Sequence, residues 1–374
     1  MTERSSRRGF LGAGIGLMAA PQAGAADLKL PVRALGKTGL KPTVLGFGCM
    51  TTSDPSVIEQ AVDAGITYFD SARGYQGGQN ERMVGSALKA KRKSILLSSK
   101  SGARSAAQAR EHLETSLKEL QTDYLDIWYL HSRSTPENVP DDQLDVQDQA
   151  KKEGKIRFRG VSLHSNMTTM IPWLVKKGRT DVILTAYNFT MEPEMDKVLK
   201  EASEAGIGIV AMKVMAGGFR TNKPGTPNHE KLSRQGALPA ALKWAVRNPY
   251  VHTSIPGITD LDQLDENYKA VAGGWKPADG KLLAAQLKAI SPLYCRICGK
   301  CGYECEKGLP HSDIIRIVSY AEGYGEFPLA RERWMELSEE QRSVRCSDCS
   351  ACSVKCPHGV HVAERVMRAQ ELFA

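Results

Sequence analysis

Eight of the nine cysteines lie in two short stretches near the end of the 374-residue chain. Each stretch has the spacing C-x2-C-x2-C-x3-C, which is typical of bacterial iron–sulfur ligation. Three thiolates at steps of three can surround one face of a four-iron cluster, and the fourth usually ligates the neighbouring cluster. The spacing therefore predicts two [4Fe-4S] clusters with exchanged ligands, held by Cys295, Cys298, Cys301, Cys305, Cys346, Cys349, Cys352 and Cys356.

Two other uses of clustered cysteines fit this pattern less well. Disulfides are common in exported proteins, but sulfurs repeated at steps of three residues make a poor disulfide framework. Zinc accepts paired C-x2-C sites, yet four thiolates crowded into one short stretch are not typical of its sites. Glu306 also follows Cys305 where the motif often has a proline, as Pro357 follows Cys356. The ninth cysteine, Cys49, is expected to be a small buried apolar residue rather than a redox group.

The segment between the two cysteine motifs has a helical pattern of apolar residues. It is 40 residues long, from Glu306 to Arg345, which is longer than the gap in a compact small ferredoxin. We therefore expect residues 285–374 to form a small helical ferredoxin-type domain with two clusters. The apolar positions that indicate a helix are Ile314, Ile315, Ile317, Val318 and Ala321.

A second set of reactive side chains lies far upstream of the cysteines. Asp70 ends one β-branched run, and Tyr75 stands five residues after it. Lys100 follows a second run and His131 follows a third. If these runs are parallel strands of one barrel, the four side chains share the rim where barrel enzymes keep their chemistry. Each residue alone could be a helix cap, a rim tyrosine, a solvated lysine or a core histidine, but their shared rim favours a catalytic tetrad.

Eight β-branched runs alternate with helix-like stretches between residues 33 and 273. This number of units matches a (β/α)8 TIM barrel of about 250 residues, which we assign to residues 33–275. A doubly wound sheet is the alternative, but it would normally show a glycine-rich turn after the first strand. The expected strands are 43–46, 66–70, 95–99, 125–130, 156–161, 182–186, 207–212 and 252–255. The expected helices are 56–64, 79–91, 106–120, 142–153, 167–177, 192–204, 238–247 and 261–271.

The composition is that of an ordinary globular α/β protein with two or three compact units. The formal charge is +8, with 25% charged and 41% hydrophobic residues, and the basic residues are spread through the chain. This balance excludes a membrane bundle and a coiled coil, and it offers no footprint for nucleic-acid binding.

The first 25 residues have the pattern of an export signal. Arg7 and Arg8 precede a mild apolar run at 10–20, and small residues at 23–25 resemble an A-x-A cleavage site. The run is shorter than the roughly 20 residues of a membrane-spanning helix, so we expect no stable span. The arginine pair predicts a twin-arginine signal peptide over residues 1–25, export of the folded protein and a periplasmic location. A disordered basic N-terminus is the alternative.

The tetrad belongs to a wider set of motifs in the barrel region. These motifs make residues 33–273 resemble an aldo-keto reductase, and the cysteine-rich end resembles that of the iron–sulfur-bearing branch of the same superfamily. The stretches that carry the resemblance are Arg33–Leu40, Phe69–Tyr75, Asn80-Glu81, Asp123–Asp126, His131, Gly154–Arg157 and Ile255–Gly257.

The resemblance implies a role for each member of the tetrad. Tyr75 would be the general acid that protonates the carbonyl oxygen of the substrate as hydride reaches the carbon. Its ordinary pKa near 10 is high for this task, so Lys100 would lower it while Asp70 holds the lysine by an ion pair. His131 would donate a hydrogen bond to the same oxygen.

The resemblance also implies a nicotinamide nucleotide, NAD(P), as the hydride carrier. Leu163 and Leu184 stand where the family usually has asparagine and glutamine, and Met212 or Lys213 replaces a ring-stacking tyrosine. No lysine or arginine lies between Pro256 and Asn267, so no clamp for the 2′-phosphate of NADP is evident. The residues implied to contact the nucleotide are Ser162, Asn188, Met212, Lys213, Gly257, Gln263, Glu266 and Asn267.

Two classes of function follow. The first is an exported oxidoreductase that transfers hydride to a small carbonyl compound or from an alcohol. The second is an iron–sulfur protein with an idle barrel, which either transfers electrons to a redox partner protein or docks a partner through its helical end. Hydride transfer moves two electrons together, whereas a [4Fe-4S] cluster transfers one at a time. The sequence shows no motif for a flavin, which could pass the two electrons on singly.

Overall fold

A computed structural model of the protein describes residues 29–219, 236–302 and 304–373, and the expected signal peptide at 1–25 lies outside them. Eight parallel strands form one sheet in the order β1 to β8. Parallel bridges from Leu45 to Ser254 and from Gly48 to Gly257 join the first strand to the last, so the sheet closes into the expected (β/α)8 barrel. The strands are β1 Phe47–Gly48, β2 Tyr68–Asp70, β3 Leu96–Ser101, β4 Leu125–Leu130, β5 Ile156–Leu163, β6 Val182–Ala186, β7 Gly208–Met212 and β8 Thr253–Ser254.

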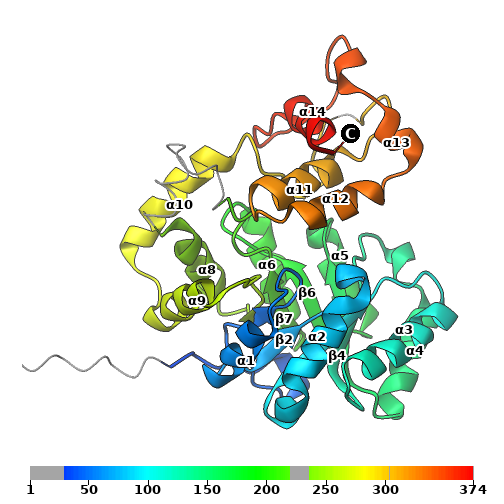
Figure 1. Ribbon diagram of the computed structural model, residues 1–374, viewed down its shortest axis with the longest axis vertical. Coiled ribbons are helices and arrows are strands. Elements are labelled where there is room, and N and C mark those ends of the chain that lie inside the picture. Colours follow the sequence, from blue (N-terminus) through cyan, green and yellow to red (C-terminus); the bar gives the residue numbers. More distant parts are fainter. Residues whose placement is uncertain (1–28, 220–235, 303, 374) are drawn as a thin grey trace, which may run out of the picture.

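Helices on the outside of the barrel alternate with these strands (Figure 1). Their sequences show why they form here: Asp54, Ser105 and Asp260 each cap a helix N-terminus by accepting a hydrogen bond from a backbone N–H. No helix among the described residues is long and apolar enough to cross a membrane. The helices of the barrel are α1 Pro55–Asp63, α2 Gln79–Leu88, α3 Ala106–Glu119, α4 Asp141–Lys152, α5 Met167–Lys177, α6 Pro193–Glu204, α8 Ala237–Arg247 and α9 Leu261–Gly273.

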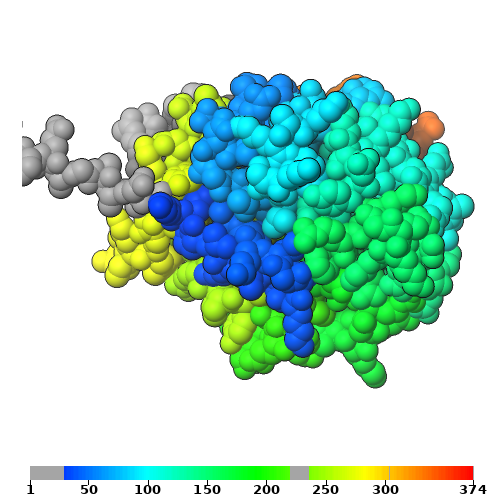
Figure 2. All heavy atoms as spheres, turned by 90° about the horizontal axis from the view of Figure 1, so that it is seen from below, coloured from blue at the N-terminus to red at the C-terminus, as the bar shows by residue number. Residues whose placement is uncertain are grey.

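The expected first strand is displaced from the observed one. Residues 43–46 were expected as a strand, but β1 begins at Phe47. Thr43 instead makes an isolated antiparallel bridge with Val32, which turns the segment across the lower end of the barrel. Leu35 and Leu40 from this segment pack into the barrel interior, and Figure 2 shows the segment in dark blue on that lower face.

The C-terminal region forms a second apolar core beside the barrel. The helices of this region are α11 His311–Glu322, α12 Phe327–Met335, α13 Glu339–Ser343 and α14 Val362–Phe373, whereas α10 Pro277–Ile290 packs against α8 of the barrel. Ile314, Val318, Trp334 and Val366 are buried together there, and six of the motif cysteines pack against this cluster. Figure 1 shows α11 to α14 above the barrel end opposite the N-terminal segment, with α10 beside α8. The helical character expected for this region is therefore present.

A small residue in β5 sets the packing of the barrel interior. The ring of Tyr129 lies against Gly160, and a Cβ at Gly160 would stand 2.2 Å from a ring carbon. Tyr129 cannot simply move away, because it is fully buried and its hydroxyl lies 2.8 Å from that of Tyr68. Glycine is therefore required at this strand position for steric reasons.

We expect Gly160→Ala to destabilise the fold by about 1–3 kcal/mol, the usual cost of overpacking a filled core. The measurement is the free energy of unfolding from urea titration followed by circular dichroism. Gly102→Ala is the matched control, because a Cβ at that exposed glycine meets nothing within 4 Å. Equal stability of the two variants would contradict the steric argument.

Candidate active site

A buried chain of polar contacts joins three members of the tetrad. Asp70 is the last residue of β2, and Lys100 lies in the neighbouring β3. The ammonium group of Lys100 donates to Asp70 Oδ2 at 2.5 Å, to the backbone oxygen of Ser71 at 2.6 Å and to the Tyr75 hydroxyl at 3.2 Å. These three acceptors use the three protons of a lysine ammonium, so the ion is fully hydrogen-bonded although its side chain is only 1% exposed.

Burial and charge act on these groups in opposite directions. Burial raises the pKa of Tyr75 above its ordinary value, and the positive charge of Lys100 lowers that pKa part of the way back. Burial alone lowers the pKa of Lys100, but the negative charges of Asp70 and Tyr75 outweigh it and raise that pKa. The sequence predicted the direction of the lysine's effect on Tyr75. It did not predict that burial would outweigh it.

The loop that carries Tyr75 is held by the residues just after it. Gln76 has a left-handed backbone, with φ of 51°, and its side-chain amide donates to the backbone oxygens of Met50 and Thr52. Asn80 donates to the backbone oxygen of Cys49 and accepts from the Ser71 hydroxyl. The residues around Asn80 therefore fix the loop that carries the Tyr75 phenol without contacting the phenol.

His131 directly follows β4 and completes the tetrad. Its ring lies edge-on to the Tyr75 ring with the centroids 6.0 Å apart, and 5.4 Å from the ring of His164. Burial, followed by the positive charge of Lys100, lowers the pKa of His131 well below its ordinary value. The imidazole is therefore neutral near pH 7 and can donate one hydrogen bond to a carbonyl oxygen beside Tyr75.

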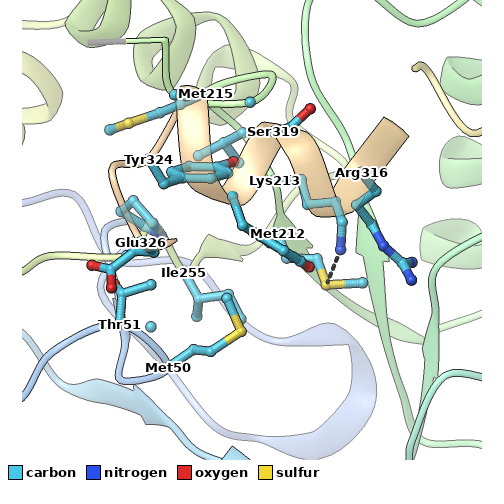
Figure 3. Close-up of a pocket in the computed structure, with 18 of the residues that line it drawn as sticks. Met50, Thr51, Met212, Lys213, Met215, Ile255, Arg316, Ser319, Tyr324 and Glu326 are labelled. Atoms are coloured by element: carbon cyan, nitrogen blue, oxygen red, sulfur yellow. Dashed lines mark hydrogen bonds between the residues drawn. The ribbon is translucent and has the colours of Figure 1, made fainter. Parts of the chain in front are cut away.

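The tetrad opens into a cavity of about 390 Å³ that has walls from both parts of the chain. Tyr75, His131 and Met212 line it from the barrel, whereas Arg316 and Tyr320 line it from α11. Figure 3 shows α11 crossing over Met212 and Lys213, with Arg316 and Tyr324 reaching toward the barrel. The C-terminal helices therefore cover the mouth of the barrel and contribute side chains to the cavity.

Glycines allow the two parts to approach so closely. A Cβ at Gly323, just after α11, would stand 1.9 Å from the backbone oxygen of Gly217 in the loop after β7. A Cβ at Gly218 would stand 2.5 Å from the ring of Tyr324. The Tyr324 hydroxyl also hydrogen-bonds to the backbone of Gly217. This contact holds α11 over the cavity.

The residues implied to hold a nucleotide fall into two groups. Met212, Lys213, Gly257 and Gln263 line the cavity. Ser162, Asn188, Glu266 and Asn267 are not among its lining residues. Ser162 Oγ accepts from the backbone of Ser132 at 2.8 Å, and the Asn188 amide donates to the backbone oxygen of Lys213 and to the Tyr294 hydroxyl. The side chains of Ser162 and Asn188 therefore hold loops at the rim.

Asn267 has a different environment from Asn188. It is fully buried, and neither its amide nitrogen nor its amide oxygen has a hydrogen-bond partner among the described residues. Unsatisfied buried amides are rare and costly. Asn267 does not line the cavity, so its implied contact with the adenosine end of a nucleotide stays a prediction.

The structure explains the leucines that depart from the family pattern. Leu163 and Leu184 are fully buried in apolar clusters, so they do not face the cavity. His164 lines the cavity instead, next to His131. Sequence reasoning missed His164, and it also missed Arg316, Tyr320, Tyr324 and Arg333 of the C-terminal region. The only sequence signal for His164 was its place at the end of the fifth strand.

The motif cysteines form two groups, each with a member from the other motif. Gly302 and Lys355 exchange backbone hydrogen bonds as an antiparallel bridge, which brings the end of each motif beside the other. Burial and then the neighbouring Cys301, Cys298 and Cys356 raise the pKa of Cys295 to about 12. Burial and then Cys305, Cys349 and Cys352 raise the pKa of Cys346 to about 11.

These groups contain free thiols. All eight motif cysteines are unpaired, as is Cys49, which is buried in the barrel core as expected. No three histidine, cysteine, aspartate or glutamate side chains among the described residues converge closely enough to hold a single metal ion. Four thiols in each group are the donor set of a [4Fe-4S] cluster, whose irons each take a single thiolate, so the residues fit this cofactor.

Comparisons with known proteins agree with the barrel fold. Residues 46–237 match the model of the aldo/keto reductase family. An uncharacterized oxidoreductase of Bacillus subtilis, YqkF, is 29% identical over 304 residues, which cover 70% of this chain and 97% of the relative. The L-galactose dehydrogenase of Arabidopsis thaliana is 27% identical over 282 residues, which cover 65% of this chain and 88% of the relative.

A solved structure shares the architecture. The holo form of an aldo-keto reductase from Bacillus halodurans superposes with a TM-score of 0.59 and 26% identity, covering 68% of this chain and 96% of its own. The family model ends at residue 237, so the cysteine motifs lie outside it. With the family model matched over half of the chain and the tetrad assembled at the barrel mouth, this protein is a member of the aldo/keto reductase family and an oxidoreductase.

Proposed function

We propose that the protein is an exported, NAD(P)-dependent oxidoreductase that interconverts a small carbonyl compound and its alcohol, and that it carries two [4Fe-4S] clusters. The observation that carries the catalytic proposal is the buried contact of Lys100 with both Asp70 and Tyr75, at the wall of a cavity that His131 also lines. This arrangement offers a proton donor and a second hydrogen-bond donor to one carbonyl oxygen.

A bound nicotinamide would supply hydride to the carbonyl carbon, or accept it in the reverse direction. Tyr75 gives its hydroxyl proton to the carbonyl oxygen, which becomes the alcohol. Lys100 stabilises the phenolate that remains, and Asp70 keeps the lysine charged and in place. The neutral imidazole of His131 donates a hydrogen bond to the same oxygen and orients the carbonyl.

The shape of the cavity supports nucleotide binding. It extends from Tyr75 past Met212 to Pro256 and Gly257, which are the barrel positions where the resemblance implies the two ends of the nucleotide. No lysine or arginine lies between Pro256 and Asn267, so we propose no preference for NADP over NAD.

Two groups of cysteines support the cluster proposal. Cys295, Cys298, Cys301 and Cys356 would hold one cluster, and Cys305, Cys346, Cys349 and Cys352 would hold the other. Such clusters supply one-electron transfer or structural cross-links. Cys349 is exposed, which favours a redox partner protein at the second cluster and supports electron transfer as a second function.

Tyr75→Phe tests the catalytic proposal. The variant keeps the ring but removes the proton donor, so turnover should fall about 10²- to 10⁴-fold while nucleotide affinity hardly changes. The assay is carbonyl reduction with NADH and NADPH over a panel of aldehydes and quinones. Tyr124→Phe is the matched control, since its ring contacts Arg92 outside the cavity. Equal turnover of wild type and Tyr75→Phe, or no nucleotide binding by wild type, would favour the idle-barrel alternative.

Iron analysis tests the clusters and their exchanged ligands. Anaerobically purified protein should contain about eight iron atoms and about eight acid-labile sulfides per chain. Cys305→Ser and Cys346→Ser should each lose the same cluster, so their double variant should lose no more iron than either single change. Cys305→Ser combined with Cys356→Ser should lose both clusters.

The matched control for these changes is Cys49→Ala, which lies in the barrel core and should keep all the iron. Electron paramagnetic resonance of the reduced proteins identifies which cluster remains. Zinc in place of iron would refute the cluster proposal. If Cys305→Ser and Cys346→Ser removed different clusters, so that the double variant lost both, the proposed exchange of ligands would be refuted.

Fractionation of cells tests export. Changing both Arg7 and Arg8 to lysine keeps the positive charge but should leave the precursor in the cytoplasm, because the twin-arginine route reads the arginine pair. Arg4→Lys in the same segment is the control and should be exported normally. Normal translocation of the double-lysine variant would show that another route exports the protein and would refute the twin-arginine proposal.

A further inference from the structure

One side of the active-site cavity is rich in hydrogen-bond donors that take no part in the proposed proton transfer to the carbonyl oxygen. Lys213 follows β7 and lines the cavity together with His164 at the end of β5. Arg316 lines the same cavity from α11 of the C-terminal region. Figure 3 shows Lys213 next to Met212 with Arg316 to the right of both, and the positive charge of Arg316 acts on Lys213. Three donors from distant parts of the sequence therefore meet beside the tetrad.

The lysine and the histidine form a defined pair. Lys213 Nζ lies 3.0 Å from His164 Nδ1, and it makes a longer contact of 4.0 Å with the sulfur of Met212. A lysine ammonium can only donate, so Nδ1 accepts and the ring proton of neutral His164 stands on Nε2. That Nε2 is buried and has no hydrogen-bond partner among the described residues. The pair therefore presents unused N–H groups.

Fixed carboxylates do not neutralise this side of the cavity. Arg316 forms an ion pair of 2.9 Å with Asp313 on the same helix, and the Asp313 side chain is half exposed. The Nε of Arg316 is buried and has no hydrogen-bond partner among the described residues. Among the carboxylates that line the cavity, Glu336 pairs with Arg333 and Asp70 is held by Lys100. The third, Glu326, lies near Thr51 on the other side of the cavity from Lys213 (Figure 3). No carboxylate of the described residues forms an ion pair with Lys213. A buried cation without a counter-ion is costly unless a ligand provides one.

The electrostatics of Lys213 agree with this arrangement. Burial, followed by the positive charges of Arg316 and Lys100, lowers its pKa to about 7, and Asp313 opposes the shift. An anion bound at Lys213 would raise that pKa again, because opposite charges favour the protonated lysine.

We infer that this side of the cavity binds an anionic group of the substrate, and that the substrate is an oxo acid or the matching hydroxy acid. The ring of His131, which would hydrogen-bond the reacting carbonyl, lies 5.4 Å from the ring of His164, and His164 contacts Lys213. One small molecule can therefore place its carbonyl at Tyr75 and its carboxylate at Lys213. A carboxylate is acceptor-only and matches the unused donors. This inference rests on the proposed carbonyl chemistry and adds the substrate class to it.

The test compares two probes that differ in a single charge. Phenylglyoxylate and its methyl ester carry the same ketone, but only the acid carries a carboxylate. Isothermal titration calorimetry of the full-length holoprotein gives the Kd of each. Wild type should bind the acid at least about tenfold more tightly than the ester. Lys213→Met and Arg316→Met should each weaken binding of the acid by about 10- to 100-fold and leave the ester unchanged.

Arg331→Met is the matched control, because this exposed arginine of α12 does not line the cavity. Equal affinity of wild type for acid and ester would overturn the inference. A loss of NADH or NADPH affinity in Lys213→Met, with the difference between acid and ester retained, would also overturn it by assigning the cations to the phosphates of the nucleotide.

Failure of the two proposals can be told apart by binding in Tyr75→Phe. That variant keeps Lys213 and Arg316, so it should still prefer the acid even though it turns over slowly. Preference for the acid in a protein that has no carbonyl reductase activity would support the anion site and refute the catalytic proposal alone.

Discussion

The buried ion pair of Lys100 and Asp70 is the constraint on which the rest of the site depends. Removing both charges from water is costly, and only complete hydrogen bonding makes the arrangement tolerable. The three acceptors of Lys100 are the side chain that ends β2, the backbone after it and the phenol of the next turn. Neighbouring strands in register satisfy that demand, and the same geometry places Tyr75 at the cavity wall. Structure and reactivity therefore share one set of contacts.

The cover over the barrel mouth is equally important for the cavity. A bare barrel would leave Tyr75 and His131 open to water, where charges are screened and a weak donor gains little. Here α11 lies over the rim through the contact of Gly217 and Gly323, and it brings Arg316 and Tyr320 into the wall. The C-terminal region thus acts on the active site directly, whatever its cysteines hold.

The proposed clusters lie close to the proposed chemistry. Cys295 is both a member of the first cysteine group and a lining residue of the cavity. Its neighbour Tyr294 also lines the cavity and accepts a hydrogen bond from Asn188 at the barrel rim. The sequence indicated a barrel for two-electron hydride transfer and a separate cysteine-rich region for one-electron clusters. In the structure, residues of both regions line the same cavity.

Periodicity and spacing in the sequence determined the eight strand–helix units, the tetrad and the two cysteine motifs, because these are local patterns that each element carries by itself. Local sequence patterns did not determine the residue at which β1 begins. Thr43 pairs with Val32 and Leu35 packs into the barrel interior, so tertiary contacts decided that boundary. The roles of His164, Lys213 and Arg316 were decided by tertiary structure alone. His164 directly follows β5, Lys213 directly follows β7, and Arg316 belongs to α11 of another region. Nothing in their sequence spacing indicates that the folded chain brings them to one cavity.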